Sequence, residues 1–184
     1  MTAGSGILHQ EMPQPSDRMF GVQLWLNLPA RDKMAAPKYH GIRKGDIPVI
    51  DEGERKIHIL AGRYAGSCGA MEGDYCKPLL LDVEMRAGAG WSLNVEGYRT
   101  LFVYIFQGEG TFGSARLIPA RHAVLFDETG TFQVNASDQG IRFFLMAGDP
   151  LQEPIAWGGP IVMNTREELQ LAFRELDENT FIKT

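Results

Sequence analysis

The sequence predicts an all-β protein, a β-barrel or sandwich followed by one C-terminal helix. Three observations support this prediction. Short apolar segments recur between residues 55 and 149, and 21 Gly and 10 Pro among the 184 residues punctuate the chain. Several segments alternate apolar and polar residues with period two, as half-buried strands do. A helical period of apolar residues occurs once, after residue 165.

The strand-sized segments fall into two groups. GVQLWLNLP at residues 21–29 comes first, and its apolar residues from Val22 to Leu28 share one face, which we expect to be buried. Pro29 ends this run. Seven more segments follow, at residues 55–62, 79–85, 91–96, 101–113, 122–130, 131–135 and 141–149. Turn residues separate them, as in an antiparallel barrel or sandwich.

Two of these segments indicate which residues lie in the core of the barrel. In LLLDVEM at 79–85, Leu81 and Val83 share a face opposite Asp82, which indicates a sheet with one buried face. LFVYIF at 101–106 is apolar on both faces, which favours a central strand. We expect the core residues to include Leu93, Phe102, Tyr104 and Phe106 in the barrel, and Trp25 and Trp91 to pack in cores as well.

The prediction of a C-terminal helix rests on a capping box at its start and on apolar residues at helical spacing after it. Thr165 and Glu168 form a capping box, in which each side chain satisfies a backbone donor at the helix start. An apolar stripe with helical spacing then follows, made of Leu169, Ala172, Phe173 and Leu176. We expect this stripe to dock on the barrel.

Residues 30–53 separate the two groups of strands. This stretch holds charges, prolines and glycines without a sustained period, and it is longer than most connections inside a compact domain. It therefore reads as a linker or wrapping segment between two units. We place the boundary near Val49 to Gly53.

Composition excludes several classes of protein. The net charge of -5 and the absence of a basic stripe argue against direct nucleic-acid binding, which draws on clustered Lys and Arg. No apolar run is long enough for a membrane span, and no secretory signal stands at the start. Cys68 and Cys76 fit no zinc motif, and we expect reduced thiols. The expected location is cytoplasmic, with the nucleus as the alternative in a eukaryote.

His9 and Glu11 are the residues that suggest chemistry. They lie two apart in GSGILHQE, a stretch that reads as a strand, so both side chains should point to one face. Imidazole and carboxylate are good metal ligands, but a non-haem iron site needs three or four protein ligands. Spacing does not single out His40, His58 or His122 as a third ligand.

Motifs for other catalytic classes are missing. Neither G-x-S-x-G nor a P-loop occurs in the sequence. The nearest phosphate-loop look-alike, GEGTFG at 108–113, leads into no helix and is typical of a hairpin turn.

Four runs of residues resemble sequences of the pirin family. Pirins are two-domain proteins of the cupin superfamily. These runs are MTAGSGILHQEMP (1–13), GVQLWLNLP (21–29), KMAAPKY (33–39) and GDPLQEPIAWGGPIVMNTREEL (148–169). The resemblance implies two tandem cupin β-barrels, with one iron in the N-terminal barrel held by three histidines and a glutamate. It assigns two of these metal ligands to His9 and Glu11.

The other two ligands of the family belong to an H-x-H motif upstream of the stretch that Met1 matches. We therefore expect an incomplete N-terminal barrel. Residues 1–50 would be the end of that barrel plus the linker, 51–163 the C-terminal cupin, and 164–184 the C-terminal helix and tail. The C-terminal barrel should be free of metal, as in the family.

The resemblance implies two classes of function. Some pirin-like proteins cleave flavonols such as quercetin with O2, and Glu11 would then act as general base or ligand beside His9. Because the chain supplies only these two ligands, we expect it to be inactive or very weak. The alternative is a non-catalytic protein-binding, transcriptional-regulator or redox-sensor role, with a protein partner.

A homodimer is a third hypothesis. An incomplete first barrel exposes strand edges and the apolar residues Leu24, Leu26 and Leu28, and such surfaces pair with other chains. Two copies of His9 and Glu11 would then share a metal across the two-fold axis.

Overall fold

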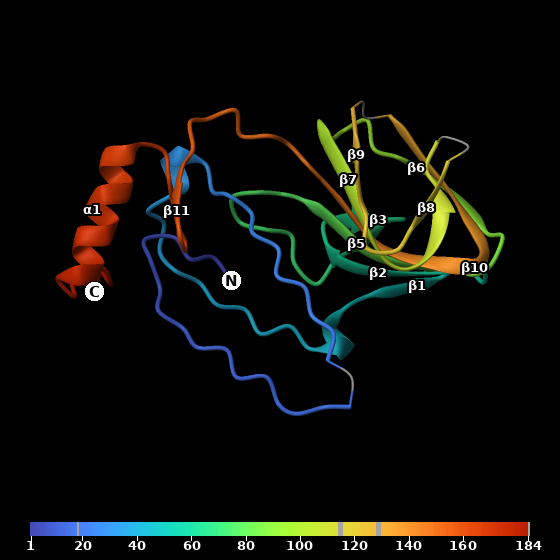
Figure 1. Cartoon of the computed structure of the whole chain (residues 1–184), viewed down its shortest axis with the longest axis horizontal. Coiled ribbons are helices and arrows are strands. Elements are labelled where there is room, and N and C mark those ends of the chain that lie inside the picture. The colour runs from blue at the N-terminus through green and yellow to red at the C-terminus, as the bar shows by residue number, and fades with distance from the viewer. Residues whose placement is uncertain (18, 114–115, 128–129, 184) are drawn as a thin grey trace. The chain divides into compact units, whose positions relative to one another are not determined.

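The computed structural model describes residues 1–17, 19–113, 116–127 and 130–183 (Figure 1). It has two compact units. We call residues 1–41 with 151–184 the terminal unit, and residues 42–150 the barrel unit. These limits differ from the predicted boundaries near residues 50 and 163, because residues 156–163 pair as a hairpin that packs on the C-terminal helix. The assignment of 1–50 and 51–163 to two cupin domains stays a prediction.

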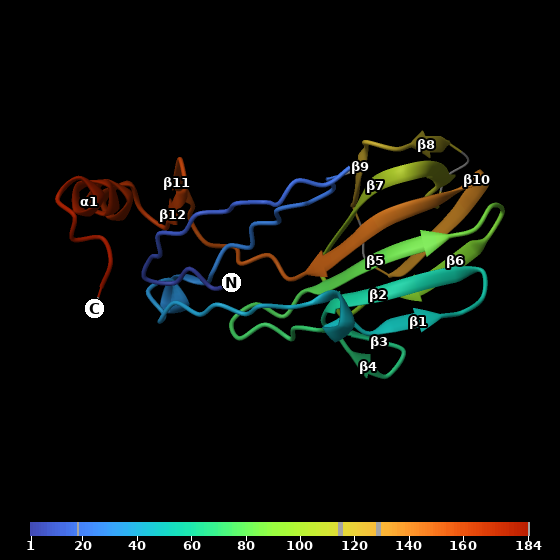
Figure 2. The same ribbon diagram turned by 90° about the horizontal axis from the view of Figure 1, so that it is seen from below.

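An eight-stranded antiparallel sheet forms the barrel unit (Figures 1 and 2). Its strand order is β1-β2-β5-β10-β7-β8, while β6 pairs with β10 and β9 pairs with β7. The strands are β1 (Val49–Asp51), β2 (Arg55–Ala61), β5 (Leu79–Met85), β6 (Gly90–Asn94), β7 (Thr100–Thr111), β8 (Leu117–Pro119), β9 (Ala123–Phe126) and β10 (Thr131–Gly148). A small separate hairpin is made by β3 (Arg63–Tyr64) and β4 (Ser67–Cys68). The prediction of an all-β fold is confirmed.

Strand β10 is the long strand that connects the parts of the sheet. It pairs with β6 through residues 131–135 and with β5 through residues 141–147, so the two strands predicted at 131–135 and 141–149 are one. An irregularity against β7 between Ala136 and Ile141 bends it. A Cβ on Gly108 would lie 2.0 Å from the carbonyl oxygen of Gly140, so the bend brings two backbones together where only glycine fits.

The barrel core confirms one predicted face and corrects another. Leu81 and Val83 are fully buried, as predicted. In β7, however, the buried residues are Leu101, Val103 and Ile105, while the predicted core residues Phe102, Tyr104 and Phe106 lie on the opposite face. The prediction for β7 was wrong because its residues are apolar on both faces, so hydrophobicity does not reveal which face points inward. Leu93 is partly buried and packs against the core.

The helix of the terminal unit begins where the sequence predicted. Helix α1 spans Arg166–Asp177, and both hydrogen bonds of the capping box are present at Thr165. Its stripe packs against the hairpin of β11 (Ala156–Gly158) and β12 (Ile161–Met163) within the terminal unit, while the expected docking on the barrel stays a prediction. The hairpin and helix pack closely because Gly158 lacks a side chain, and a Cβ there would lie 3.0 Å from the Phe173 ring.

Residues 21–29 form no strand (Figure 1). Val22 and Leu26 are each 52% exposed and Leu24 is 41% exposed, so the expected buried face is wrong. Within the described part of the chain no strand pairs with this stretch, so there is no sheet in which its apolar face could be buried. Trp25 is likewise 56% exposed, whereas Trp91 is buried in the barrel core as predicted. None of the described helices is long and apolar enough to cross a membrane.

Candidate functional site

The first six residues are fastened within the terminal unit. The backbone of Thr2 exchanges two hydrogen bonds with Lys38, at 2.8 and 2.9 Å, and the Ser5 amide donates to the Ala35 carbonyl at 2.8 Å. Gly6 is buried with φ of +122°, and a Cβ there would lie 2.5 Å from the Phe181 ring. Only glycine fits this position, because a side chain would meet both backbone strain and the ring. The C-terminal tail thus fixes the chain just before the candidate ligands.

His9 and Glu11 follow this anchor on an exposed stretch. The structure assigns no strand to residues 7–11, so the predicted strand is wrong. The reason is the same as for residues 21–29: no strand of the described chain lies in register beside them. No sheet therefore enforces a common face for the two side chains. Both remain open to solvent, and neither forms a hydrogen bond or ion pair with any described residue.

The donor types fit a metal, but their number does not complete a site. Imidazole and carboxylate suit iron, whose protein sites need three or more ligands. Among residues 1–17, 19–113, 116–127 and 130–183, no group of three His, Cys, Asp or Glu could hold a metal ion. His40, in the terminal unit, is exposed, as is His122 in the barrel unit. His9 and Glu11 thus supply two ligands, fewer than the three that an iron site needs.

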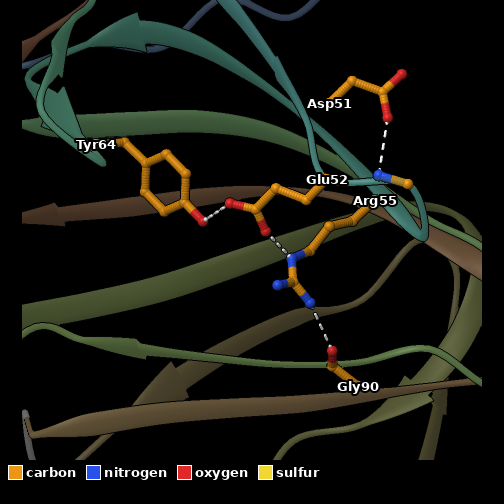
Figure 3. Close-up of polar contacts among 6 residues, drawn as sticks. Asp51, Glu52, Arg55, Tyr64 and Gly90 are labelled. Atoms are coloured by element: carbon orange, nitrogen blue, oxygen red, sulfur yellow. Dashed lines mark hydrogen bonds and ion pairs between the residues drawn. The ribbon is translucent and has the colours of Figure 1, made fainter.

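A polar network in the barrel unit has a structural role (Figure 3). The carboxylate of Glu52 accepts a hydrogen bond from the Tyr64 hydroxyl at 2.9 Å and also pairs with the Arg55 guanidinium. Arg55 donates in turn to the carbonyl oxygen of Gly90 at 2.8 Å. Burial, and then the hydrogen bond to Glu52, raise the pKa of Tyr64. The network ties the β1–β2 turn to β3 and β6.

The turn itself holds another carboxylate. The Asp51 side chain accepts a hydrogen bond from the Gly53 amide at 2.9 Å (Figure 3). This bond, helped by nearby Lys56, lowers the pKa of Asp51. Alternation in the sequence marks such residues only as solvent-facing, and it contains no signal for these partnerships.

An ion pair lies on the sheet face opposite the core. Asp82 and Arg142 form a bidentate pair, with Nε to Oδ1 at 2.9 Å and the second nitrogen to Oδ2 at 2.7 Å. The Asp82 hydrogen bond raises the pKa of Arg142. Asp82 faces away from the core, as its sequence pattern predicts, yet it is only 8% exposed. Neither Cys68 nor Cys76 forms a disulfide, in agreement with the expected thiols.

Comparison with known proteins identifies the family. The model of the pirin C-terminal cupin domain matches residues 80–182, more than half of the chain. The chain belongs to the pirin family. It is 40% identical to "Putative quercetin 2,3-dioxygenase Ta0133" of Thermoplasma acidophilum, with 100% of this chain and 77% of that protein aligned. It is 36% identical to a pirin-like protein of Solanum lycopersicum, with 98% of this chain and 64% of that protein aligned.

Solved structures agree with the fold of this pirin-like chain. The crystal structure of a quercetin 2,3-dioxygenase from Acinetobacter baumannii superposes with a TM-score of 0.78 at 32% identity. The match covers 85% of this chain and 55% of that one. The chain is therefore an all-β cupin with a C-terminal helix, and it spans about half to three quarters of the relatives it matches.

Proposed function

We propose that the chain serves an iron-dependent, quercetin 2,3-dioxygenase-type reaction in which His9 and Glu11 are two of the metal ligands. The observation that supports this most directly is the state of the two side chains. Both are exposed and neither is engaged by a described residue, so both are available to a metal. Relatives and a solved neighbour whose names include quercetin 2,3-dioxygenase agree with this reaction class.

Among the described residues, His9 and Glu11 find no third ligand beside them, so we expect the 184-residue protein to be inactive or very weak. Iron in such a site would act as a Lewis acid toward the oxygens of a flavonol. The chain's own contribution is a carboxylate, since Glu11 is placed in solvent where it can accept the proton of a flavonol hydroxyl as general base. Activity then depends on ligands beyond those that the described residues bring together.

Metal binding tests this assignment. Ferrous iron is titrated into the untagged chain under anaerobic conditions, and bound metal is measured by plasma mass spectrometry after buffer exchange. His9→Ala and Glu11→Ala should each reduce the bound iron, because each removes a ligand. His40→Ala is the matched control, since His40 is also exposed in the terminal unit and should leave binding unchanged. Equal binding by the wild type and His9→Ala would contradict the assignment.

A non-catalytic, protein-binding or regulatory role is the second candidate. The apolar stretch around Val22, Leu24 and Trp25 is exposed, as surfaces that bind other proteins often are. The homodimer hypothesis draws on the same stretch. Light scattering after size exclusion tests it, because only a mass of two chains at micromolar concentration, halved by Leu24→Asp, agrees with pairing through this segment. A monomer at that concentration eliminates the shared metal site.

A further inference from the structure

The hairpin of β11 and β12 forms an open groove with helix α1. The groove has a volume of about 470 Å³. Its lining is Ile155, Ala156, Trp157, Asn164, Arg166, Leu169 and Gln170. We call it the hairpin–helix groove. It lies wholly within residues 151–184, far along the sequence from His9 and Glu11, and the proposed iron chemistry does not use it.

Two large apolar side chains of the groove face solvent. Ile155 is 67% exposed and Trp157 is 72% exposed. Both line the groove, Trp157 within β11 and Ile155 directly before it. The indole N–H of Trp157 donates to the carbonyl oxygen of Gly159 at 2.8 Å, which holds the ring while its surface stays open. A fixed, exposed tryptophan is a favourable anchor point for a partner, because little rotamer entropy remains to be lost.

Arg166 supplies the charge of the groove. It is the sole charged residue of the lining and the first residue of α1. In the part of the chain that the structure describes, its side chain has no hydrogen-bond or ion-pair partner. A cation at a helix N-terminus opposes the helix dipole, so Arg166 does not serve the stability of α1. One carboxylate oxygen of the neighbouring Glu168, Oε2, accepts hydrogen bonds from the amides of Asn164 and Thr165, at 3.0 and 2.9 Å.

We propose that the hairpin–helix groove binds an acidic peptide segment of a partner protein. An apolar side chain of the peptide packs on Trp157 and Ile155, and a neighbouring carboxylate pairs with the Arg166 guanidinium. Charge complementarity favours an acidic peptide, because the residues that line the groove include one cation and no acid. An extended peptide suits the groove better than a small molecule, because the open surface leaves Trp157 mostly in solvent whereas small-molecule sites bury most of their ligand.

Fluorescence anisotropy with a defined probe tests the proposal. The probe is a fluorescein-labelled pentapeptide with a central phenylalanine and two glutamates on each side, and we expect saturable binding to the full chain below about 1 mM. One control peptide carries lysines in place of the glutamates, and another carries glycine in place of the phenylalanine. Both should bind at least fivefold more weakly, because each lacks one of the two contacts.

Arg166→Gln is the deciding variant. It removes the charge without harming the helix, and it should weaken binding of the acidic probe about fivefold, as expected for an exposed ion pair. Arg174→Gln is the matched control, since Arg174 is an exposed arginine of α1 outside the groove, and it should not change binding. Trp157→Ala should weaken binding tenfold or more.

Three results would overturn the proposal. The first is no binding of the acidic probe at 1 mM, and the second is equal binding of the lysine peptide. The third is an unchanged dissociation constant in Arg166→Gln. Because the assay uses no metal and no flavonol, its outcome does not depend on the reaction proposed for His9 and Glu11.

Discussion

The hydroxyl of Tyr64 is the most informative group to remove from the barrel unit. Tyr64→Phe keeps the ring, which lies edge-on to Trp91 at 5.9 Å between centroids, and deletes the hydroxyl that donates to Glu52 at 2.9 Å. A hydrogen bond to a charged group contributes about 1.5–3 kcal/mol. The Glu52 side chain is 26% exposed, so water reaches the freed carboxylate and the lower end applies. We expect a loss of about 1.5 kcal/mol, or roughly 6 °C in Tm for a domain of this size.

Urea unfolding followed by tryptophan fluorescence and by far-UV circular dichroism measures this loss. Tyr104→Phe is the control, because Tyr104 is 38% exposed and its variant should stay within about 0.5 kcal/mol of the wild type. A double-mutant cycle of Tyr64→Phe with Glu52→Ala should give a coupling energy of about 1 kcal/mol. A coupling energy near zero would refute the reasoning, since water would then be as good a hydrogen-bond acceptor for the Tyr64 hydroxyl as Glu52 is.

The pH dependence gives an independent check of the same contact. Burial and the hydrogen bond to Glu52 raise the pKa of Tyr64 above its ordinary value of 10.0, so the folded state favours the neutral phenol. This stabilisation is complete below pH 10 and is lost as the pH rises through the pKa of the folded state. Tyr64→Phe lacks the titrating group, so the difference in stability between the two proteins should shrink above pH 10. A difference that stays constant from pH 8 to pH 11 would contradict this account.

Three more substitutions test other contacts. Asp82→Asn should lower the free energy of unfolding in urea by about 2 kcal/mol, because it removes the negative charge of a mostly buried ion pair while Arg142 is exposed enough to be rehydrated. An unchanged free energy of unfolding would show that this ion pair does not stabilise the fold. Gly6→Ala should destabilise the terminal unit by about 3 kcal/mol, since it adds backbone strain and an overlap with Phe181, and faster hydrogen exchange at residues 2–6 would report it. Thr165→Ala should cost about 1 kcal/mol through the lost cap, measured as reduced helical ellipticity on heating, and an unchanged melt would speak against the capping box.

The metal ligands show how far sequence reasoning reached. Residue type and resemblance to the pirins single out His9 and Glu11, and membership of the family is now established. The stretch that holds them was also expected to be a strand, which the structure does not show. A strand needs a neighbour to hydrogen-bond, and one sequence does not say whether that neighbour is present. The role of the two residues as ligands stays a prediction for the metal titration.

Local patterns in the sequence determined much of the fold. The capping box placed the start of α1 at Thr165, because both of its hydrogen bonds connect residues three apart. Alternation placed Leu81 and Val83 in the core and Asp82 outside it, because side chains of a strand alternate between faces. These features depend on neighbours in the chain, and the sequence alone contains them.

Only the tertiary structure decided the features that depend on distant segments. It chose Val103 over Tyr104 for the core of β7, where hydrophobicity is equal on both faces. It brought Phe181 onto Gly6, and it left Trp157 exposed in a groove that Arg166 also lines. In each case the free energy depends on which remote residue becomes a neighbour. No periodicity along one chain records that choice, because packing is decided in three dimensions.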